Sequence, residues 1–293
     1  MHWIQILFEA EKSIAMQLED ALVTQNALAV TLSDAADQPL FEPEPGATPL
    51  WEAIRVMGLF DAATPTEAIT QSLQAHFGSS LPKYKIEILE DKDWIKEWMD
   101  QFKPIQFTDK LWICPTWLEP PDPSAANIML DPGMAFGTGT HATTALCLTW
   151  LGKLELSGKS LIDYGCGSGI LAVGAYLLGC TKLFAVDIDP QALQATANNA
   201  QQNHIPEACI EICLPQDLST EPVDILIANI LAGPLISLAP TLEKLVQANG
   251  KLALSGILTS QTEQVISAYQ PWFTFEPVVE KDGWVLLSGV KTS

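Results

Sequence analysis

Leu161-Ile-Asp-Tyr-Gly-Cys-Gly-Ser-Gly169 joins an apolar run to three glycines at alternate positions. The apolar residues 170–178 that follow predict a buried helix. A strand that leads through a glycine turn into a helix directs backbone N–H groups and a helix N-terminus into one crevice. Side chains at these glycines would block the approach of a ligand. The stretch therefore predicts a ligand-binding loop at the edge of a parallel sheet.

The next apolar run, residues 183–187, ends in a second acidic residue, Asp187, 24 residues after Asp163. This spacing places the Asp187 carboxylate at the tip of the neighbouring parallel strand. A carboxylate at that position can accept hydrogen bonds from a ribose. We therefore expect the ligand to contain a nucleoside.

The order of the glycines bears on which cofactor binds. The loop reads Gly-x-Gly-x-Gly, whereas dinucleotide sites read Gly-x-Gly-x-x-Gly. Asp163, two residues before Gly165, adds negative charge where a pyrophosphate would be disfavoured. It suits a cationic ligand such as S-adenosylmethionine, which carries a sulfonium and an amino group. With Gly167 and Gly169 the pattern resembles motif I of the seven-strand methyltransferases; the alternative is a tight turn in another α/β sheet.

Residues 130–144 form a loop rich in glycine and threonine that leads into an apolar helix at residues 145–151. A hydroxyl-rich loop at a helix start can bind a carboxylate, so Thr144 is a candidate contact for the methionine end of the cofactor. Thr143 or Thr144 could equally be the N-cap of the helix. His141 is a candidate general base, although a hydrogen-bonding role is more common for a single loop histidine.

Residues 223–234 predict a strand that ends at Asn229 and a helix that opens at Pro234. Asn229 then stands at the carboxyl end of a parallel strand, the edge where open α/β sheets bind ligands. Methyl transfer to an amine needs a neutral nitrogen in line with the sulfonium methyl, and orientation supplies much of the rate. The Asn229 side-chain oxygen and the following backbone carbonyl can accept N–H bonds from that amine. The alternative is that Asn229 caps the following helix.

The order of predicted elements gives the fold class. Alternating strands and helices, closed by an antiparallel hairpin over residues 273–290, predict a seven-strand Rossmann-like α/β sheet with one reversed strand for residues 119–293. Residues 1–90 read βαββαβ, which indicates a small α+β ferredoxin-like domain. Residues 91–118 are expected to be a linker containing a helix, with the apolar residues of 90–102 on one helical face.

Charge narrows the classes of partner. The net charge is −20 and Arg55 is the only arginine, so the Lys/Arg stripe of a nucleic-acid-binding surface is missing and direct nucleic-acid binding is not expected. Residues 1–100 hold 17 acidic and 6 basic residues, a net charge of −11. We therefore interpret the first domain as a recognition module for a basic partner; acidity that only maintains solubility is the alternative.

Other features of the composition bear on where in the cell the protein is located. No apolar run reaches the ~20 residues that span a bilayer, and the first residues predict a strand in place of a signal peptide. The six cysteines show no Cys-x-x-Cys pair. We expect reduced thiols, no metal site, no membrane contact and a cytoplasmic location.

Four stretches together resemble the ribosomal protein L11 methyltransferase (PrmA) family, and the resemblance covers the whole chain. They are residues 130–144 (Leu-DPGMAFGTGTHAT-Thr), 163–169 (Asp-YGCGS-Gly), 186–190 (Val-DID-Pro) and 229–235 (Asn-ILAGP-Leu). The resemblance implies S-adenosylmethionine-dependent methylation of lysine ε-amines and the α-amine of a basic ribosomal protein, by an enzyme expected to be a monomer. It implies cofactor contacts at Thr144, Gly165, Asp187 and Asn229, and substrate binding by the N-terminal domain. Alternatives are another basic protein or a small-molecule amine as substrate, a nicotinamide oxidoreductase, or a protein that binds without catalysing.

Overall fold

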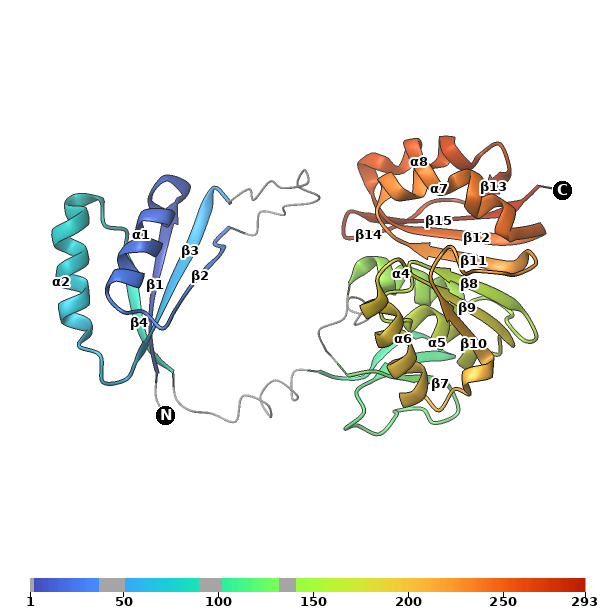
Figure 1. Cartoon of the computed structure of the whole chain (residues 1–293), viewed down its shortest axis with the longest axis horizontal. Coiled ribbons are helices and arrows are strands. Elements are labelled where there is room, and N and C mark those ends of the chain that lie inside the picture. Colours follow the sequence, from blue (N-terminus) through green and yellow to red (C-terminus); the bar gives the residue numbers. More distant parts are fainter. Residues whose placement is uncertain (1–2, 37–50, 90–101, 132–140, 293) are drawn as a thin grey trace. The chain divides into compact units, whose positions relative to one another are not determined.

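The computed structural model describes residues 3–36, 51–89, 102–131 and 141–292, and the chain divides into two compact units, Met1–Asp100 and Gln101–Ser293 (Figure 1). Each unit is a mixture of helices and strands with its own apolar core. All six residues singled out from the sequence lie in the second unit.

The first unit is a four-stranded antiparallel sheet with both helices on one face. The strand order is β2-β3-β1-β4. Alternate residues of β1, such as Ile6 and Phe8, are buried against the helices because side chains alternate between the faces of a strand. The predicted order of elements is confirmed: β1 (Trp3–Glu11), α1 (Lys12–Thr24), β2 (Ala29–Asp34), β3 (Ala53–Asp61), α2 (Thr66–Phe77) and β4 (Tyr84–Leu89).

The second unit is built on an eight-stranded sheet. Seven strands follow one path, β10-β9-β8-β11-β12-β15-β13, and β14 pairs with β15 beside that path. The strands from β10 to β12 are parallel, and β15 runs antiparallel to β12. The strands are β8 (Ser160–Tyr164), β9 (Lys182–Val186), β10 (Ile210–Cys213), β11 (Val223–Asn229), β12 (Val246–Leu258), β13 (Phe273–Phe275), β14 (Val279–Lys281) and β15 (Trp284–Lys291).

The end of this sheet differs from the predicted hairpin. The segment expected to form one strand over 273–279 is divided into β13 and β14, which pair with different parts of β15. Glu276 still continues the pairing of β13, since its backbone N–H bonds the carbonyl of Ser288 at 2.8 Å. The next residue, Pro277, has no N–H to donate, and the register against β15 has shifted by one residue where β14 begins. The single reversed strand of the seven-strand prediction corresponds to β15, and β14 is an eighth strand.

Helices cover both faces of the eight-stranded sheet (Figure 1). Leu161 faces the cluster formed with α4 and α5, while its neighbour Ile162 faces the cluster formed with α7. Because both faces are covered, the strands are continuous apolar runs, as buried parallel strands usually are. The helices are α4 (Ala142–Leu151), α5 (Ile170–Leu177), α6 (Pro190–Gln202), α7 (Ala232–Leu245) and α8 (Thr262–Tyr269). Across the described ranges, none of the helices combines the length and the apolar character that crossing a membrane requires.

A smaller three-stranded sheet completes the second unit. It consists of β5 (Ile105–Thr108), β6 (Leu111–Cys114) and β7 (Ala126–Met129), with β6 and β7 parallel. Buried residues of β6 and β7 join the core beside α5. Residues 105–114, expected within a linker, thus contribute two strands to this unit. The predicted helix over residues 90–102 lies almost entirely outside the described residues.

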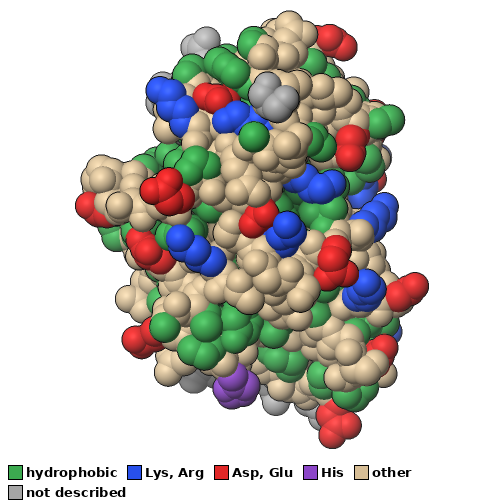
Figure 2. All heavy atoms as spheres, turned by 90° about the vertical axis from the view of Figure 1, so that its right-hand side faces the viewer, with side chains coloured by type: hydrophobic (Ala, Val, Ile, Leu, Met, Phe, Trp, Pro, Cys, Tyr) green, Lys and Arg blue, Asp and Glu red, His purple; other side chains and the backbone are tan. Residues whose placement is uncertain are grey.

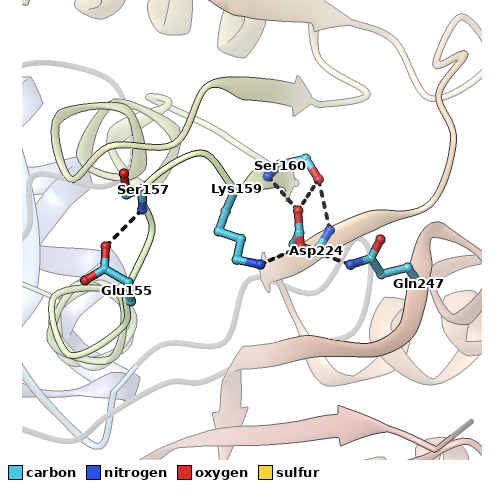
Figure 3. Close-up of polar contacts among 6 residues, drawn as sticks. All are labelled: Glu155, Ser157, Lys159, Ser160, Asp224 and Gln247. Carbon is cyan, nitrogen blue, oxygen red and sulfur yellow. Dashed lines mark hydrogen bonds and ion pairs between the residues drawn. The ribbon is translucent and has the colours of Figure 1, made fainter.

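Asp224 joins the amino-terminal ends of three neighbouring strands (Figure 3). Its Oδ2 accepts the backbone N–H of Ser160 at 3.0 Å and the Ser160 hydroxyl at 2.8 Å, where β8 begins. Its Oδ1 accepts Nζ of Lys159 at 3.0 Å and Nε2 of Gln247 at 2.9 Å, the latter at the start of β12. Partial burial raises the pKa of this carboxyl, but the hydrogen bonds from Ser160 and Lys159 outweigh burial and leave the pKa lowered.

We expect Asp224→Ala to lower the free energy of unfolding by about 2 kcal/mol, because four donors at the strand ends lose their common acceptor. Urea unfolding at neutral pH measures this change. The matched control is Glu155→Gln, since Glu155 holds only an exposed bond at 3.3 Å from the N–H of Ser157 (Figure 3). Equal stability of the two variants would contradict a clamping role for Asp224.

Candidate functional site

The six residues predicted from the sequence lie at the carboxyl ends of β8, β9 and β11 or in the first turn of α4. Thr144 contacts Asn229, and Ile230 lies against Gly165, since a Cβ on that glycine would be 2.2 Å from Ile230 Cγ2. Gly167 bonds Asp187. Asp163 lies two residues before Gly165 on β8. One continuous set of contacts and chain neighbours therefore brings all six residues together.

The glycine loop, residues 165–169, requires glycine for two separate reasons. Its three glycines have φ angles of +79°, +54° and +72°, which side-chain-bearing residues rarely adopt. At Gly165 and Gly169 there is also no room for a Cβ, which would lie 2.2 Å from Ile230 and 2.5 Å from Thr196. The side chains of Ile230, after β11, and Thr196, on α6, are thus closely packed against the loop. The amides of Gly165 and Cys166 both bond the carbonyl of Val186, at 2.7 and 3.0 Å, which ties the loop to β9.

Asp163 is a fully buried carboxyl with one unsatisfied oxygen. Its Oδ2 accepts the backbone N–H of Ala172 in the first turn of α5 at 3.1 Å, whereas Oδ1 has no hydrogen-bond partner among the described residues. Burial raises the pKa of Asp163 to about 7; the Ala172 bond acts against this and the charge of Asp187 adds to it. Buried polar atoms in folded proteins nearly always have a partner. An orphaned carboxyl oxygen in this position fits a cationic ligand group, whose charge would favour the ionised form.

Asp187 follows β9 and its carboxylate is held by two backbone amides. Oδ2 accepts the N–H of Gly167 at 2.9 Å and Oδ1 accepts the N–H of Asp189 at 3.0 Å. These bonds fix the side chain against the glycine loop. Because an ionised carboxylate offers about four acceptor positions, it retains capacity for the two hydroxyls of a ribose.

Asn229 is the last residue of β11 and is half-buried. Its Nδ2 lies 3.5 Å from Oγ1 of Thr144, at the long end of hydrogen-bond distances. With Nδ2 directed at Thr144, the opposite side of the amide presents Oδ1 as an acceptor. The capping alternative for Asn229 is excluded, because α7 has Leu231 at its N-cap and no side-chain capping bond.

The N-cap of α4 is His141, so neither threonine fills that role. The His141 ring accepts the N–H of Thr143 at 3.4 Å and lies 2.8 Å from the Thr143 hydroxyl. The ring also packs edge-on against Trp284, with the centroids 5.1 Å apart. These contacts give His141 a capping role. Thr144 is buried one position further along the helix, which leaves its hydroxyl to Asn229.

Sequence reasoning missed two apolar side chains at this edge. Ile188 follows Asp187 directly and is 82% exposed, and Leu231 follows the Asn229 turn and is 48% exposed. An exposed isoleucine between two aspartates is unusual for a solvated loop, and it provides an apolar surface next to the expected ribose position. The signal was an apolar residue within Asp-Ile-Asp, 187–189.

Gly256 of β12 was also missed. It has a φ of +83°, and a Cβ there would lie 2.3 Å from the carbonyl oxygen of Ile230. The preceding residue, Ser255, pairs with Asn229 across the two strands. Gly256 therefore lets the turn after Asn229 pass closely over β12. The sequence offered only a glycine at a strand end as a signal.

Burial and nearby negative charge keep the thiols around the site neutral. Burial, and then the negative charge of Asp163, raise the pKa of the Cys166 thiol well above its usual range. The same two causes raise the pKa of the Cys147 thiol. Neither sulfur is therefore a thiolate nucleophile at neutral pH.

On the face drawn in Figure 2, lysines and acidic side chains are interspersed and form no single basic patch.

Comparisons with known proteins give matches along the whole chain. A family model described as "Ribosomal protein L11 methyltransferase (PrmA)" matches residues 2–292. A protein of that name from Klebsiella pneumoniae is 51% identical over 294 residues, covering 99% of this chain and all of the relative, and one from Azotobacter vinelandii is 50% identical over 291 residues with the same coverage. A solved structure of a ribosomal protein L11 methylase from Lactobacillus delbrueckii subsp. bulgaricus is 30% identical, with a TM-score of 0.60, and it covers 66% of this chain and 100% of that one.

Proposed function

This chain belongs to the ribosomal protein L11 methyltransferase family, and we propose that it transfers methyl groups from S-adenosylmethionine to amines of ribosomal protein L11. The observation that supports this most strongly is the meeting of two acidic strand ends, a crowded glycine loop and an uncharged amide at one sheet edge. The acceptors are taken to be lysine ε-amines and the N-terminal α-amine, as the family resemblance implies.

The residues at the sheet edge fit S-adenosylmethionine. The orphaned Oδ1 of Asp163 suits the cationic methionyl end, and the lack of a side chain at Gly167 would let that end approach the loop backbone. The Asp187 carboxylate would accept the ribose hydroxyls, with Ile188 beside it as an apolar surface for the base. Thr144 would contact the methionine end from α4. When bound, the cofactor supplies the methyl group of its sulfonium. The remainder of the cofactor is then a neutral thioether.

Asn229 would orient the amine that accepts the methyl group. An amine lone pair must point along the line of the sulfonium methyl, and two fixed acceptors for its N–H bonds set that direction. Oδ1 of Asn229 and the backbone carbonyl of Ile230 are suitable acceptors. Both are uncharged, so they do not favour the protonated amine, which has no lone pair to donate. We expect the amine's proton to leave to water.

The first unit would hold the substrate. It has its own core and contributes none of the six proposed site residues. The order β2-β3-β1-β4, with helices on one face only, supports a ferredoxin-like assignment for residues 1–90. A hollow of about 710 Å³ on the open face is lined by both signs of charge, including Glu9, Arg55 and Lys85. The acidic surplus of the unit, expected to attract a basic protein, therefore lies mainly outside that hollow.

A methylation assay tests the function directly. The full chain is incubated with S-adenosylmethionine and purified ribosomal protein L11, and mass spectrometry measures mass gains in whole methyl units. A parallel calorimetric titration with NAD is the control, because the site is expected to bind S-adenosylmethionine and not the dinucleotide. Cofactor binding without any mass gain on L11 would redirect the proposal to another amine substrate.

The cytoplasmic location and the monomeric state also remain predictions.

A further inference from the structure

Helix α6 presents a row of polar side chains to the elements around the site. Thr196, Asn199 and Asn203 follow one another at helical spacing, so they lie on the same face of the helix. Thr196 and Asn199 bond the glycine loop. Asn203 bonds both the N–H and the carbonyl of Met129 at the end of β7, at 2.7 and 2.9 Å.

Thr196 contacts the glycine loop with both branches of its side chain. Its hydroxyl donates to the carbonyl of Gly167 at 3.1 Å and lies 3.3 Å from the sulfur of Cys166. Since the hydroxyl proton is used for Gly167, the Cys166 thiol is the donor to Thr196. Its methyl group occupies the space beside Gly169, where an added Cβ would lie 2.5 Å away. The residue is fully buried.

Asn199 holds the next carbonyl along the loop. Its Nδ2 donates to the carbonyl of Ser168 at 2.7 Å, from a half-buried position one turn after Thr196. Two consecutive carbonyls of the glycine loop, those of Gly167 and Ser168, are thus turned toward α6. Asn198, the neighbouring residue, is exposed and its side chain accepts only Nε2 of Gln194 at 3.0 Å.

Glycine-rich backbones change conformation at little cost, so something outside the loop must select one conformation. A carbonyl rotated into the crevice would bring negative partial charge toward the methionyl carboxylate. We propose that Thr196 and Asn199 are positioning residues for the cofactor. They keep both carbonyls against α6 and hold the loop in the conformation that admits the methionyl end. This inference rests on the proposed function, because it assumes that S-adenosylmethionine binds at the glycine loop.

The test measures the Kd of S-adenosylmethionine by calorimetry and the thermal stability of the full chain. Asn199→Ala is expected to raise this Kd about tenfold, the effect of one lost bond to a backbone carbonyl left unpaired. The matched control Asn198→Ala should stay within about twofold of the parent, as an exposed substitution usually does. At saturating cofactor, the kcat of Asn199→Ala should return to within about twofold of the parent, since the loop is then held by its ligand.

Two variants of Thr196 separate its hydroxyl from its methyl group. Thr196→Val keeps the shape beside Gly169 and removes the hydroxyl, so cofactor binding should weaken. Thr196→Ser keeps the hydroxyl, so binding should remain close to that of the parent.

A purely structural role would lower the melting temperature of Asn199→Ala and leave its Kd equal to that of Asn198→Ala, and this result would overturn the inference. Failure of the parent protein to bind the cofactor would instead overturn the proposed function.

Discussion

Asn229→Ala is expected to lower the kcat for methylation of ribosomal protein L11 about 100-fold, because the accepting amine loses the group that aims its lone pair. Cofactor binding should change far less, since the Asp163 and Asp187 carboxylates and the glycine loop remain in place. Single-turnover kinetics at saturating cofactor, with calorimetry of cofactor binding, separate the two quantities. A parental rate with parental affinity would show that Asn229 does not orient the amine.

The variant Asn229→Asp tests why this position carries an uncharged amide. Its carboxylate keeps both shape and acceptor oxygens, but its charge would favour the protonated form of a lysine amine and raise the pKa of that amine. We therefore expect a loss of rate that is partly recovered at high pH, whereas the loss in Asn229→Ala should not depend on pH.

Thr144→Val, which removes the hydroxyl facing Nδ2 of Asn229, should cause a smaller loss of rate than either Asn229 variant, because the long 3.5 Å contact is one of several restraints on the amide.

The residues at the carboxyl ends of the strands of the large sheet were predictable because their sequence signals are local. Strands buried on both faces appear as short apolar runs, and an acid or amide directly after such a run must lie at the sheet edge. Asp163, Asp187 and Asn229 were found in this way, and their strands β8, β9 and β11 are adjacent in the structure. The glycine spacing predicted a turn, and the positive φ angles at Gly165, Gly167 and Gly169 are consistent with it.

Contacts between distant segments were not predictable from local pattern. Thr196 and Asn199 approach the glycine loop only because α6 packs beside it, about 30 residues further along the chain. In the sequence, Asn199 could have faced solvent or loop backbone equally well. Likewise, the Thr144 hydroxyl contacts Asn229, 85 residues away along the chain, while His141 is the N-cap of α4. The short strand β5 was missed because its partner β6 defines it.

Affinity for S-adenosylmethionine is expected to increase with pH through about 7, because ligand binding favours the ionised form of Asp163. The pKa of this buried carboxyl is about 7 in the structure without ligand. Below that pH, binding the cationic methionyl group requires Asp163 to lose its proton, which weakens binding about tenfold for each pH unit. Lowering the pH from 7.5 to 5.5 should therefore raise the Kd on the order of thirtyfold, and calorimetry in buffers of different ionisation enthalpy should detect one released proton.

The same group has the opposite effect on the stability of the ligand-free protein. Its folded pKa of about 7 lies above the unfolded value of 3.8, so between these values the folded state binds more protons than the unfolded state. The contribution of Asp163 to stability is therefore present at low pH and is lost as pH rises through about 7. Because Asp163 is one of 35 acidic residues in the chain and the others also titrate, the difference between the parent and Asp163→Asn isolates this contribution. Asp163→Asn should bind the cofactor weakly, with an affinity nearly independent of pH from 5.5 to 7.5, and it should gain stability relative to the parent as pH increases. An equal pH dependence of cofactor affinity in both proteins would mean that another group, and not Asp163, receives the positive charge.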